Sequence, residues 1–99
     1  MTDPAPLCSF KDLKDGLPLG VTVDGRKLVV CRVGDDVRIL DGVCPHRGAP
    51  LEGGFLNDGC LVCPWHGWQF RLDDGAFVGG GVSLNARPAV VRDGKVYPE

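Results

Sequence analysis

The sequence of 99 residues lacks any long apolar run, and this absence limits where the protein can reside. No stretch approaches the ~18 consecutive apolar residues that a membrane-spanning helix needs. The opening stretch, MTDPAPLCSF, has neither the basic segment nor the apolar segment of a secretory signal. The sequence therefore predicts a soluble, cytoplasmic chain that is not held in a membrane.

An excess of positive charge is also lacking. Eleven lysines and arginines stand against thirteen aspartates and glutamates, and the formal net charge is −2. The two signs are scattered along the chain, so no basic stripe is present of the kind that neutralises nucleic-acid phosphates. We expect no nucleic-acid partner.

The sequence also lacks helical periodicity. No window keeps apolar residues at helical spacing for longer than a turn or two. Short apolar runs instead alternate with turn residues, among 15 glycines and 8 prolines. This pattern predicts an all-β fold, a small antiparallel sandwich or barrel, in a single domain that spans residues 1–99. A loop-rich domain of this size gains stability from a bound metal.

The clearest predicted element is a β-hairpin near the start of the chain. Apolar residues at 21–23 and 26–33 flank Asp24-Gly25, a dipeptide that accepts the positive φ of a type I′ turn. Turns are expected at 52–54 and 57–59, on either side of Phe55 and Leu56. Further short strands are expected at 7–10, 37–40, 60–62, 68–72, 76–78, 88–91 and 95–98.

Five cysteines are an odd number, which argues against a fully paired disulfide framework. Cys8 and Cys31 lie in apolar sequence and are expected to be buried, reduced thiols. Cys60 and Cys63 form a C-x-x-C pair that could be redox-active or bind zinc. Because Cys60 begins a predicted strand, we favour a structural role for it.

Two short segments combine cysteine with histidine: Cys44-Pro45-His46 and Cys63-Pro64-Trp65-His66. Four such ligands suit either a tetrahedral zinc ion or a [2Fe–2S] cluster. Zinc fingers usually pair cysteine with cysteine and histidine with histidine, whereas here each segment mixes the two. That arrangement allows one iron to take both cysteines and a second iron to take both histidines.

The segments CPHRGAPL and CPWHGWQF resemble the two cluster-binding loops of Rieske proteins from bacterial ring-hydroxylating oxygenase systems. The resemblance covers most of the chain. It implies the Rieske fold, with a cluster-binding subdomain formed by loops at about 41–51 and 60–70, placed on the tips of neighbouring hairpins. It also implies one Rieske-type [2Fe–2S] cluster, with Cys44, His46, Cys63 and His66 as its ligands.

Ligation by two neutral imidazoles raises the reduction potential relative to an all-cysteine cluster, into a band of roughly −150 to +300 mV. High-potential Rieske proteins carry an extra cysteine in each loop, where this chain has Ala49 and Trp65. They also carry serine and tyrosine hydroxyls where this chain has Trp68 and Phe70. The resemblance therefore implies a potential at the low end of the band.

Another departure concerns the three glycines at 79–81. Ferredoxins of this type often cover the cluster with a proline-bearing loop, and the glycines stand at that place. The resemblance alone leaves open how such a loop shields a cluster.

The resemblance implies a monomeric one-electron carrier that docks transiently with a flavin-dependent NAD(P)H reductase and a terminal oxygenase. An oxygenase needs further histidines for a mononuclear iron, and this chain has two histidines in total. We therefore expect no catalytic residues and no enzyme activity. Two alternatives stay open: the small subunit of a larger redox enzyme such as a nitrite reductase, and a zinc-stapled interaction domain.

Overall fold

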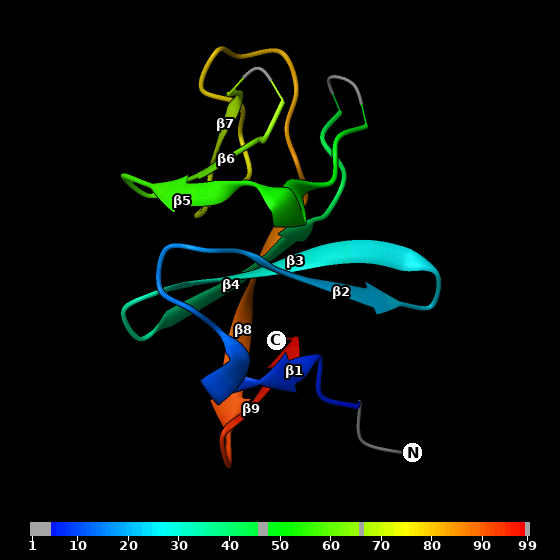
Figure 1. Cartoon of the computed structure of the whole chain (residues 1–99), viewed down its shortest axis with the longest axis vertical. Helices are drawn as coiled ribbons and strands as arrows, with labels where there is room; N and C mark the ends of the chain where they lie inside the picture. The colour runs from blue at the N-terminus through cyan, green and yellow to red at the C-terminus, as the bar shows by residue number, and fades with distance from the viewer. Residues whose placement is uncertain (1–4, 46–47, 66, 99) are drawn as a thin grey trace.

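The computed structural model describes residues 5–45, 48–65 and 67–98. Its strands form one six-stranded and one three-stranded antiparallel sheet (Figure 1). The strands are β1 (Cys8–Ser9), β2 (Leu19–Val23), β3 (Arg26–Val33), β4 (Asp36–Asp41), β5 (Phe55–Asn57), β6 (Cys60–Val62), β7 (Gln69–Arg71), β8 (Ala86–Arg92) and β9 (Lys95–Pro98). Within the described ranges the only helical elements are two 3₁₀ turns, η1 (Phe10–Asp12) and η2 (Leu51–Gly53), so the all-β prediction is confirmed. None of these elements is a helix long and apolar enough to cross a membrane.

The larger sheet has the strand order β1-β9-β8-β4-β3-β2 and curls toward closure. Its edge strands β1 and β2 are not paired with each other, yet Cys8 of β1 and Val21 of β2 pack against the same group of buried residues. Val30 on β3 and Val96 on β9 belong to that group. The larger sheet is therefore a nearly closed barrel, as the predicted small sandwich or barrel requires.

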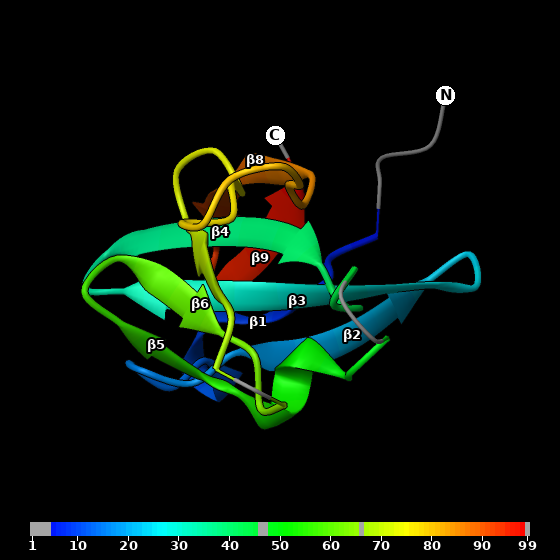
Figure 2. The same cartoon turned by 90° about the horizontal axis from the view of Figure 1, so that it is seen from above.

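The smaller sheet, in the order β5-β6-β7, stands at one end of the elongated molecule (Figures 1 and 2). Side chains alternate along β3, so that Val29 and Cys31 face the opposite way from Val30. Val29 and Cys31 join a second core cluster, which also contains Leu61 of β6 and Phe70 of β7. This shared core packs the smaller sheet against the barrel.

The predicted first hairpin is confirmed, with Leu19 paired to Val30 and Val23 paired to Arg26. Asp24 and Gly25 at its turn have φ values of 51° and 80°. An aspartate with positive φ followed by a glycine also joins β5 to β6 and β8 to β9. The same dipeptide thus makes three of the tight turns in this fold.

The structure adds one strand to the prediction and removes another. Phe55 and Leu56, for which no strand was predicted, belong to strand β5, and the turn predicted at 57–59 joins β5 to β6. Residues 76–78 do not form a strand, and only isolated bridges occur there, since glycines interrupt the chain on both sides. The second loop joins β6 to β7, and the first is closed by an antiparallel bridge between Val43 and Pro50, so each loop stands at the tip of an antiparallel turn.

Candidate metal centre

The first ligand loop is closed by main-chain hydrogen bonds around Cys44. The Cys44 N–H donates to the Ala49 carbonyl at 2.9 Å, and the Gly48 N–H donates to the Cys44 carbonyl at 2.8 Å. Gly48 has φ of 75°, which residues with a Cβ rarely adopt. These bonds turn the chain back on itself directly after Cys44.

The second ligand loop repeats this arrangement around Cys63. The Cys63 N–H donates to the Trp68 carbonyl at 2.7 Å, which is the same five-residue spacing as Cys44 to Ala49. Gly67 has φ of 70° and stands four residues after its cysteine, as Gly48 does in the first loop. A proline follows each cysteine, so the two loops share one local geometry.

The two loops bring their cysteines together. Cys44 and Cys63 are 1% and 2% exposed, and their thiols lie within hydrogen-bonding distance of each other. Burial is the main cause that raises the pKa of Cys63; the contact with Cys44 raises it further, while the Trp65 N–H favours the thiolate. Both cysteines are free rather than disulfide-bonded.

This pair is chemically suited to a soft metal. A thiolate in a buried site needs a nearby positive charge, because burial removes the water that would otherwise stabilise it. A metal supplies that charge, and thiolates are the ligands that iron–sulfur clusters and zinc share. The donors Cys44 and Cys63 therefore fit the metal centre expected from the sequence.

The predicted ligands His46 and His66 lie outside the described residues, so their ligation stays a prediction. Among residues 5–45, 48–65 and 67–98, no group of three or more potential metal ligands comes together. Within those ranges the site consists of the two thiols and their supporting shell.

An aromatic cluster supports the second loop. The rings of Trp68 and Phe77 stack with centroids 4.0 Å apart and planes inclined by 7°. Phe70, which is fully buried, lies 5.7 Å from Phe77 and 6.4 Å from Trp68. The cluster connects the core to the end of the second loop.

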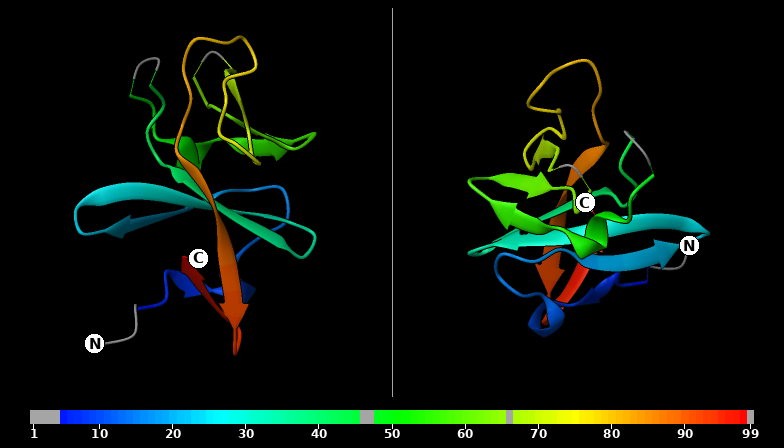
Figure 3. Two further views of the ribbon diagram at one scale, coloured as in Figure 1. Left: turned by 180° about the vertical axis from the view of Figure 1, so that it is seen from behind. Right: turned by 45° about the horizontal axis from the view of Figure 1, so that its top comes forward.

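A third loop, residues 77–82, stands at the same end of the molecule as both ligand loops (Figures 1 and 3). The Phe77 N–H donates to the Val82 carbonyl at 3.1 Å, and the Gly80 N–H donates to the Phe77 carbonyl at 2.9 Å. Val78 and Val82 are 62% and 42% exposed, and Trp65 in the second ligand loop is 48% exposed. This end of the molecule therefore presents apolar side chains to solvent.

The base of the first ligand loop is tied to the barrel. The Asp41 N–H donates to the Asn85 carbonyl at 3.1 Å, and the Asn85 N–H donates to an Asp41 carboxylate oxygen at 2.8 Å. The Gly42 N–H donates to the Lys27 carbonyl, and the Leu51 N–H donates to the Gly42 carbonyl, both at 2.9 Å. Main-chain bonds thus fix both ends of this loop.

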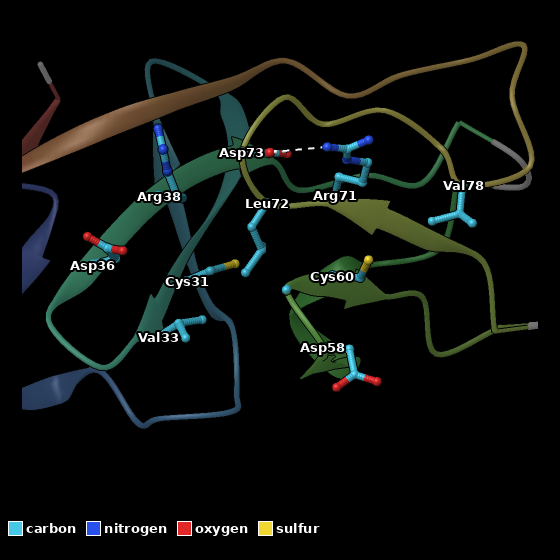
Figure 4. Close-up of a pocket in the computed structure, with 11 residues that line it drawn as sticks. Cys31, Val33, Asp36, Arg38, Asp58, Cys60, Arg71, Leu72, Asp73 and Val78 are labelled. Atoms are coloured by element: carbon cyan, nitrogen blue, oxygen red, sulfur yellow. Dashed lines mark hydrogen bonds and ion pairs between the residues drawn. The ribbon is translucent and has the colours of Figure 1, made fainter.

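A cavity of about 550 Å³ lies between the two sheets (Figure 4). Cys31 on β3 and Cys60 on β6 line it from opposite sides. Burial raises the pKa of Cys31 to about 12 and is the main cause that raises the pKa of Cys60, so neither is a good nucleophile at neutral pH. Arg71 at the rim is paired with Asp73 at 3.3 Å. The lining therefore offers no reactive group.

The remaining cysteines agree with structural roles. Cys31 is buried as expected and Cys60 is also buried, whereas Cys8, which was expected to be buried, is only half-buried on β1. Cys60 begins β6 and pairs with Asn57 and Arg71 across the small sheet. The C-x-x-C spacing of Cys60 and Cys63 therefore reflects a strand that leads into the second loop.

Residues 3–85 match the sequence profile of the Rieske [2Fe-2S] domain, which covers most of the chain. The chain belongs to the Rieske [2Fe-2S] domain family. Membership implies one Rieske-type [2Fe–2S] cluster as cofactor, in agreement with the paired thiols. It also bears out the resemblance of the two cysteine-histidine segments to Rieske loops.

Two curated relatives illustrate the range of proteins that contain this domain. The ferredoxin component of the alkene monooxygenase system of Xanthobacter autotrophicus is 32% identical over 92 residues, which are 91% of this chain and 75% of that protein. TIC 55 of Arabidopsis thaliana is 44% identical over 67 residues, which are 67% of this chain. The matched segment spans only 12% of the length of TIC 55.

Three solved structures are similar over nearly the whole chain. A ferredoxin from Sphingomonas yanoikuyae B1 has a TM-score of 0.88 at 28% identity and 98% coverage of each chain. A chain from the complex of oxygenase and ferredoxin in carbazole 1,9a-dioxygenase has a TM-score of 0.85 at 30% identity, over 96% of this chain and 100% of that chain. A putative nitrite reductase small subunit from Mycobacterium tuberculosis has a TM-score of 0.84 at 28% identity, over 93% and 89%.

Sequence reasoning missed the residues that support the loops. Phe77 stacks on Trp68, and Asp41 bonds to the main chain of Asn85, yet neither residue stands in a recognisable motif. The strands expected at 68–72 and 76–78 placed Phe70 and Phe77 in neighbouring segments, but nothing in the sequence indicated that Phe77 stacks on Trp68. Only an Asp-Gly pair at Asp41 indicated a turn at that position.

Proposed function

We propose that this chain is a Rieske ferredoxin, a one-electron carrier between a flavin-dependent NAD(P)H reductase and a terminal oxygenase. The observation that carries the proposal is the pair of buried thiols, Cys44 and Cys63, at an end that also exposes apolar side chains. A redox centre beneath an apolar surface suits brief contacts with two partners in turn. The match to a ferredoxin over 98% of each chain supports the same function.

The proposed cluster ligands are Cys44 and Cys63 on one iron and His46 and His66 on the other. When bound, a [2Fe–2S] cluster accepts and returns one electron. The proposed domain comprises residues 1–99, with the ligands in the two loops at about 41–51 and 60–70. The match of residues 3–85 to the family profile supports this division.

The chain provides a rigid site from which water is excluded. Cys44 and Cys63 are buried in the same core cluster as Leu51 and Phe70, which keeps water from the sulfur atoms. The Trp65 N–H hydrogen-bonds to the Cys63 sulfur and stabilises its negative charge. Because main-chain bonds close both loops, the protein needs little rearrangement when the charge at the site changes.

A low potential within the Rieske range is part of the proposal. Hydroxyl donors near a cluster stabilise its reduced, more negative form, and this chain has Trp68 and Phe70 at the relevant positions. The ring of Phe70 is fully buried in the core and cannot donate a hydrogen bond. Ala49, likewise buried, cannot form the disulfide of high-potential relatives.

The exposed apolar rim is the proposed docking surface. Trp65, Val78 and Val82 come from the second and third loops at the end that holds the cysteines. Transient redox partners use small interfaces, and a few exposed apolar residues are sufficient for one. We propose that the monomer docks there with the reductase and the oxygenase in turn.

We further propose that the chain performs no catalysis by itself and works in the cytoplasm. Its two histidines are both assigned to the cluster, which leaves none for the mononuclear iron of an oxygenase. Free thiols such as Cys8, Cys31 and Cys60 are typical of a reducing compartment. Soluble reductase and oxygenase components would meet the chain there.

Reconstitution tests the proposed function. The purified chain is combined with NAD(P)H and with the reductase and oxygenase of a ring-hydroxylating system, and hydroxylated product is measured. We expect product only when all three proteins are present. Product formed by this chain and the reductase alone would contradict the assignment.

A matched pair of variants tests the docking surface in the same assay. Trp65→Ala removes an aromatic ring that is 48% exposed at the loop end, and Phe55→Ala removes one that is 49% exposed on β5. We expect Trp65→Ala to raise the ferredoxin concentration that gives half-maximal turnover by about tenfold, a hot-spot-sized effect, and Phe55→Ala to change it little. The cluster potential, measured in both variants, separates weaker docking from an altered centre.

One alternative is favoured by a specific observation, the similarity to a putative nitrite reductase small subunit. In that case the chain would copurify with a large redox enzyme from its native host. Size-exclusion chromatography of a native extract, followed by detection of this chain, distinguishes the two functions. Elution at the size of the free chain of 10.6 kDa supports the ferredoxin.

The other alternative, a zinc-stapled interaction domain, is tested by metal analysis of the purified protein. That alternative predicts bound zinc and no acid-labile sulfide.

A further inference from the structure

The three consecutive glycines at 79–81 are present for two different physical reasons. Gly80 and Gly81 have φ values of 85° and 91°, so the turn itself requires them. Gly79 does not share this backbone conformation. A Cβ at Gly79 would lie 2.7 Å and 2.8 Å from two atoms of the Phe77 ring, so the ring lies directly against the loop backbone.

Phe77 occupies the junction between the third loop and the second ligand loop. One face of its ring stacks on Trp68, whose carbonyl accepts the hydrogen bond from the Cys63 N–H. Behind it lies Phe70, at 5.7 Å and in the buried core. A single ring thus contacts the loop backbone at Gly79, the support of a ligand cysteine, and the core.

Main-chain bonds connect the third loop to β7, next to the end of the second ligand loop. The Val78 N–H donates to the Gln69 carbonyl at 3.0 Å, and the Phe77 N–H donates to the Val82 carbonyl. Among the hydrogen bonds of the described residues, none runs from residues 77–82 to residues 63–65. The stack of Phe77 on Trp68 is a side-chain contact that joins the third loop directly to the end of the second ligand loop.

We propose that Phe77 is a positioning residue for the metal centre, which acts through Trp68 and Gly79 to hold the third loop closed beside the second ligand loop. In that position the loop limits the access of water and dioxygen to the sulfur atoms of the centre. This inference rests on the proposed ligation by Cys44 and Cys63. It assigns to an aromatic stack the shielding that a proline-bearing loop gives in other ferredoxins.

The test uses the isolated, cluster-loaded protein and needs no partner. Phe77→Ala is compared with Phe55→Ala, which removes a phenylalanine of the same small subdomain from outside the stack. The readouts are the rate at which the visible absorption bleaches in air, the reduction potential and the EPR spectrum of the reduced protein. None of these depends on turnover.

We expect Phe77→Ala to bleach about tenfold faster than wild type, since an aromatic pair contributes a factor of about 2 to 12 to an equilibrium beyond the area that it buries. The potential should rise, because water stabilises the reduced, negatively charged form of the centre. The EPR line shape should change or broaden. Phe55→Ala should match wild type in all three readouts.

Gly79→Ala tests the same contact from the other side. Its methyl group would meet the Phe77 ring, whereas the methyl group of the control Gly53→Ala would only touch Pro64 at 3.7 Å. We expect Gly79→Ala to bleach several-fold faster and Gly53→Ala to be neutral. Because Gly79 and Phe77 act through one contact, the effect of Gly79→Ala should largely disappear in the Phe77→Ala background.

Equal bleaching and potential in Phe77→Ala and Phe55→Ala would overturn the proposal, as would additive effects of Gly79→Ala and Phe77→Ala. If Phe77→Ala does not fold, the comparison of Gly79→Ala with Gly53→Ala tests the proposal instead. Equal bleaching rates in those two variants would then overturn the proposal. Failure of the reconstituted oxygenase assay would count against the proposed function but not against this contact. A wild-type protein without a [2Fe–2S] cluster would overturn both.

Discussion

The two ligand loops have the same local geometry but different supports. In each, a cysteine N–H bonds to a carbonyl five residues later, and a glycine with positive φ stands four residues after the cysteine. The first loop is fixed to the barrel by main-chain bonds at Asp41 and Gly42. The second loop depends on aromatic side chains, above all the stack of Trp68 on Phe77. One motif can therefore be held in place by backbone or by side-chain contacts.

The supports differ because the first loop follows a strand of the barrel, whereas the second follows a strand of the small sheet. The first loop leaves β4, where the neighbouring main chain at Lys27 and Asn85 offers hydrogen-bonding groups at once. The second loop leaves the small sheet, and the third loop packs beside its end through the Phe77 and Trp68 rings. Where no strand is adjacent, packing of large rings provides the contact.

Loss of either ligand cysteine should have the largest effect and should be the same for both loops. Cys44→Ala and Cys63→Ala each remove one of the two buried thiols, and we expect complete loss of the cluster absorption. Cys60→Ala, which removes a neighbouring buried thiol, should retain the spectrum. Retention of the wild-type spectrum in Cys44→Ala or Cys63→Ala would refute the ligand assignment.

The next largest effect should come from Gly42, at the base of the first loop. A Cβ there would lie 2.9 Å from the Lys27 carbonyl carbon and 3.0 Å from the Leu28 nitrogen, both of them main-chain atoms. We expect Gly42→Ala to lower the free energy of unfolding by about 1–3 kcal/mol. Thermal denaturation of the cluster-loaded protein measures this, with Gly53→Ala as control. Equal midpoints in the two variants would show that main-chain packing does not hold the first loop.

A smaller effect is expected at Asp41, whose carboxylate accepts the Asn85 N–H at 2.8 Å. Asp41→Ala should cost about 1 kcal/mol, the typical net contribution of one hydrogen bond. The ion pair of Asp41 with Arg26, at 3.8 Å and largely exposed, should add little. Arg26→Ala is therefore the control, and a cost equal to that of Asp41→Ala would show that the ion pair dominates.

The first two hairpins and the paired cysteines could be predicted from sequence because local residues determine them. Asp24-Gly25 has a conformational preference that forces a tight turn, and Cys44 and Cys63 stand in segments with few other chemical uses. Strand β5 was missed, although the turn at 57–59 was predicted, because Phe55 and Leu56 form an apolar run of only two residues. The pairing of β5 with β6 is evident only in the folded structure.

The role of the triple glycine could not be predicted, because it depends on contacts between distant residues. Gly79, Gly80 and Gly81 are identical in sequence, yet only Gly79 accommodates the ring of Phe77. Whether a ring lies there is decided by how the chain folds after β7. Sequence spacing also does not reveal that Asp41 reaches Asn85 in the segment before β8.

The smallest expected effect concerns Asp73, beside the cavity between the sheets. The hydrogen bond from Arg71 holds the pKa of Asp73 below its usual value. A carboxylate with a lowered pKa stabilises the fold above its unfolded pKa of about 3.9, and the contribution is lost as the pH falls through the lower folded pKa. We expect wild type and Asp73→Asn to differ slightly in unfolding midpoint at pH 6 and to converge as the pH falls below the lowered pKa of Asp73. A difference that grows on acidification would contradict this sign.

The central claim is that the two loops jointly hold one [2Fe–2S] cluster that carries a single electron. Anaerobic reductive titration of the purified protein, with iron and acid-labile sulfide determined on the same sample, tests it most directly. The account predicts about two irons, two sulfides and one electron per chain, with a midpoint toward the low end of the roughly −150 to +300 mV Rieske range. One zinc per chain with no sulfide and no electron uptake would contradict it.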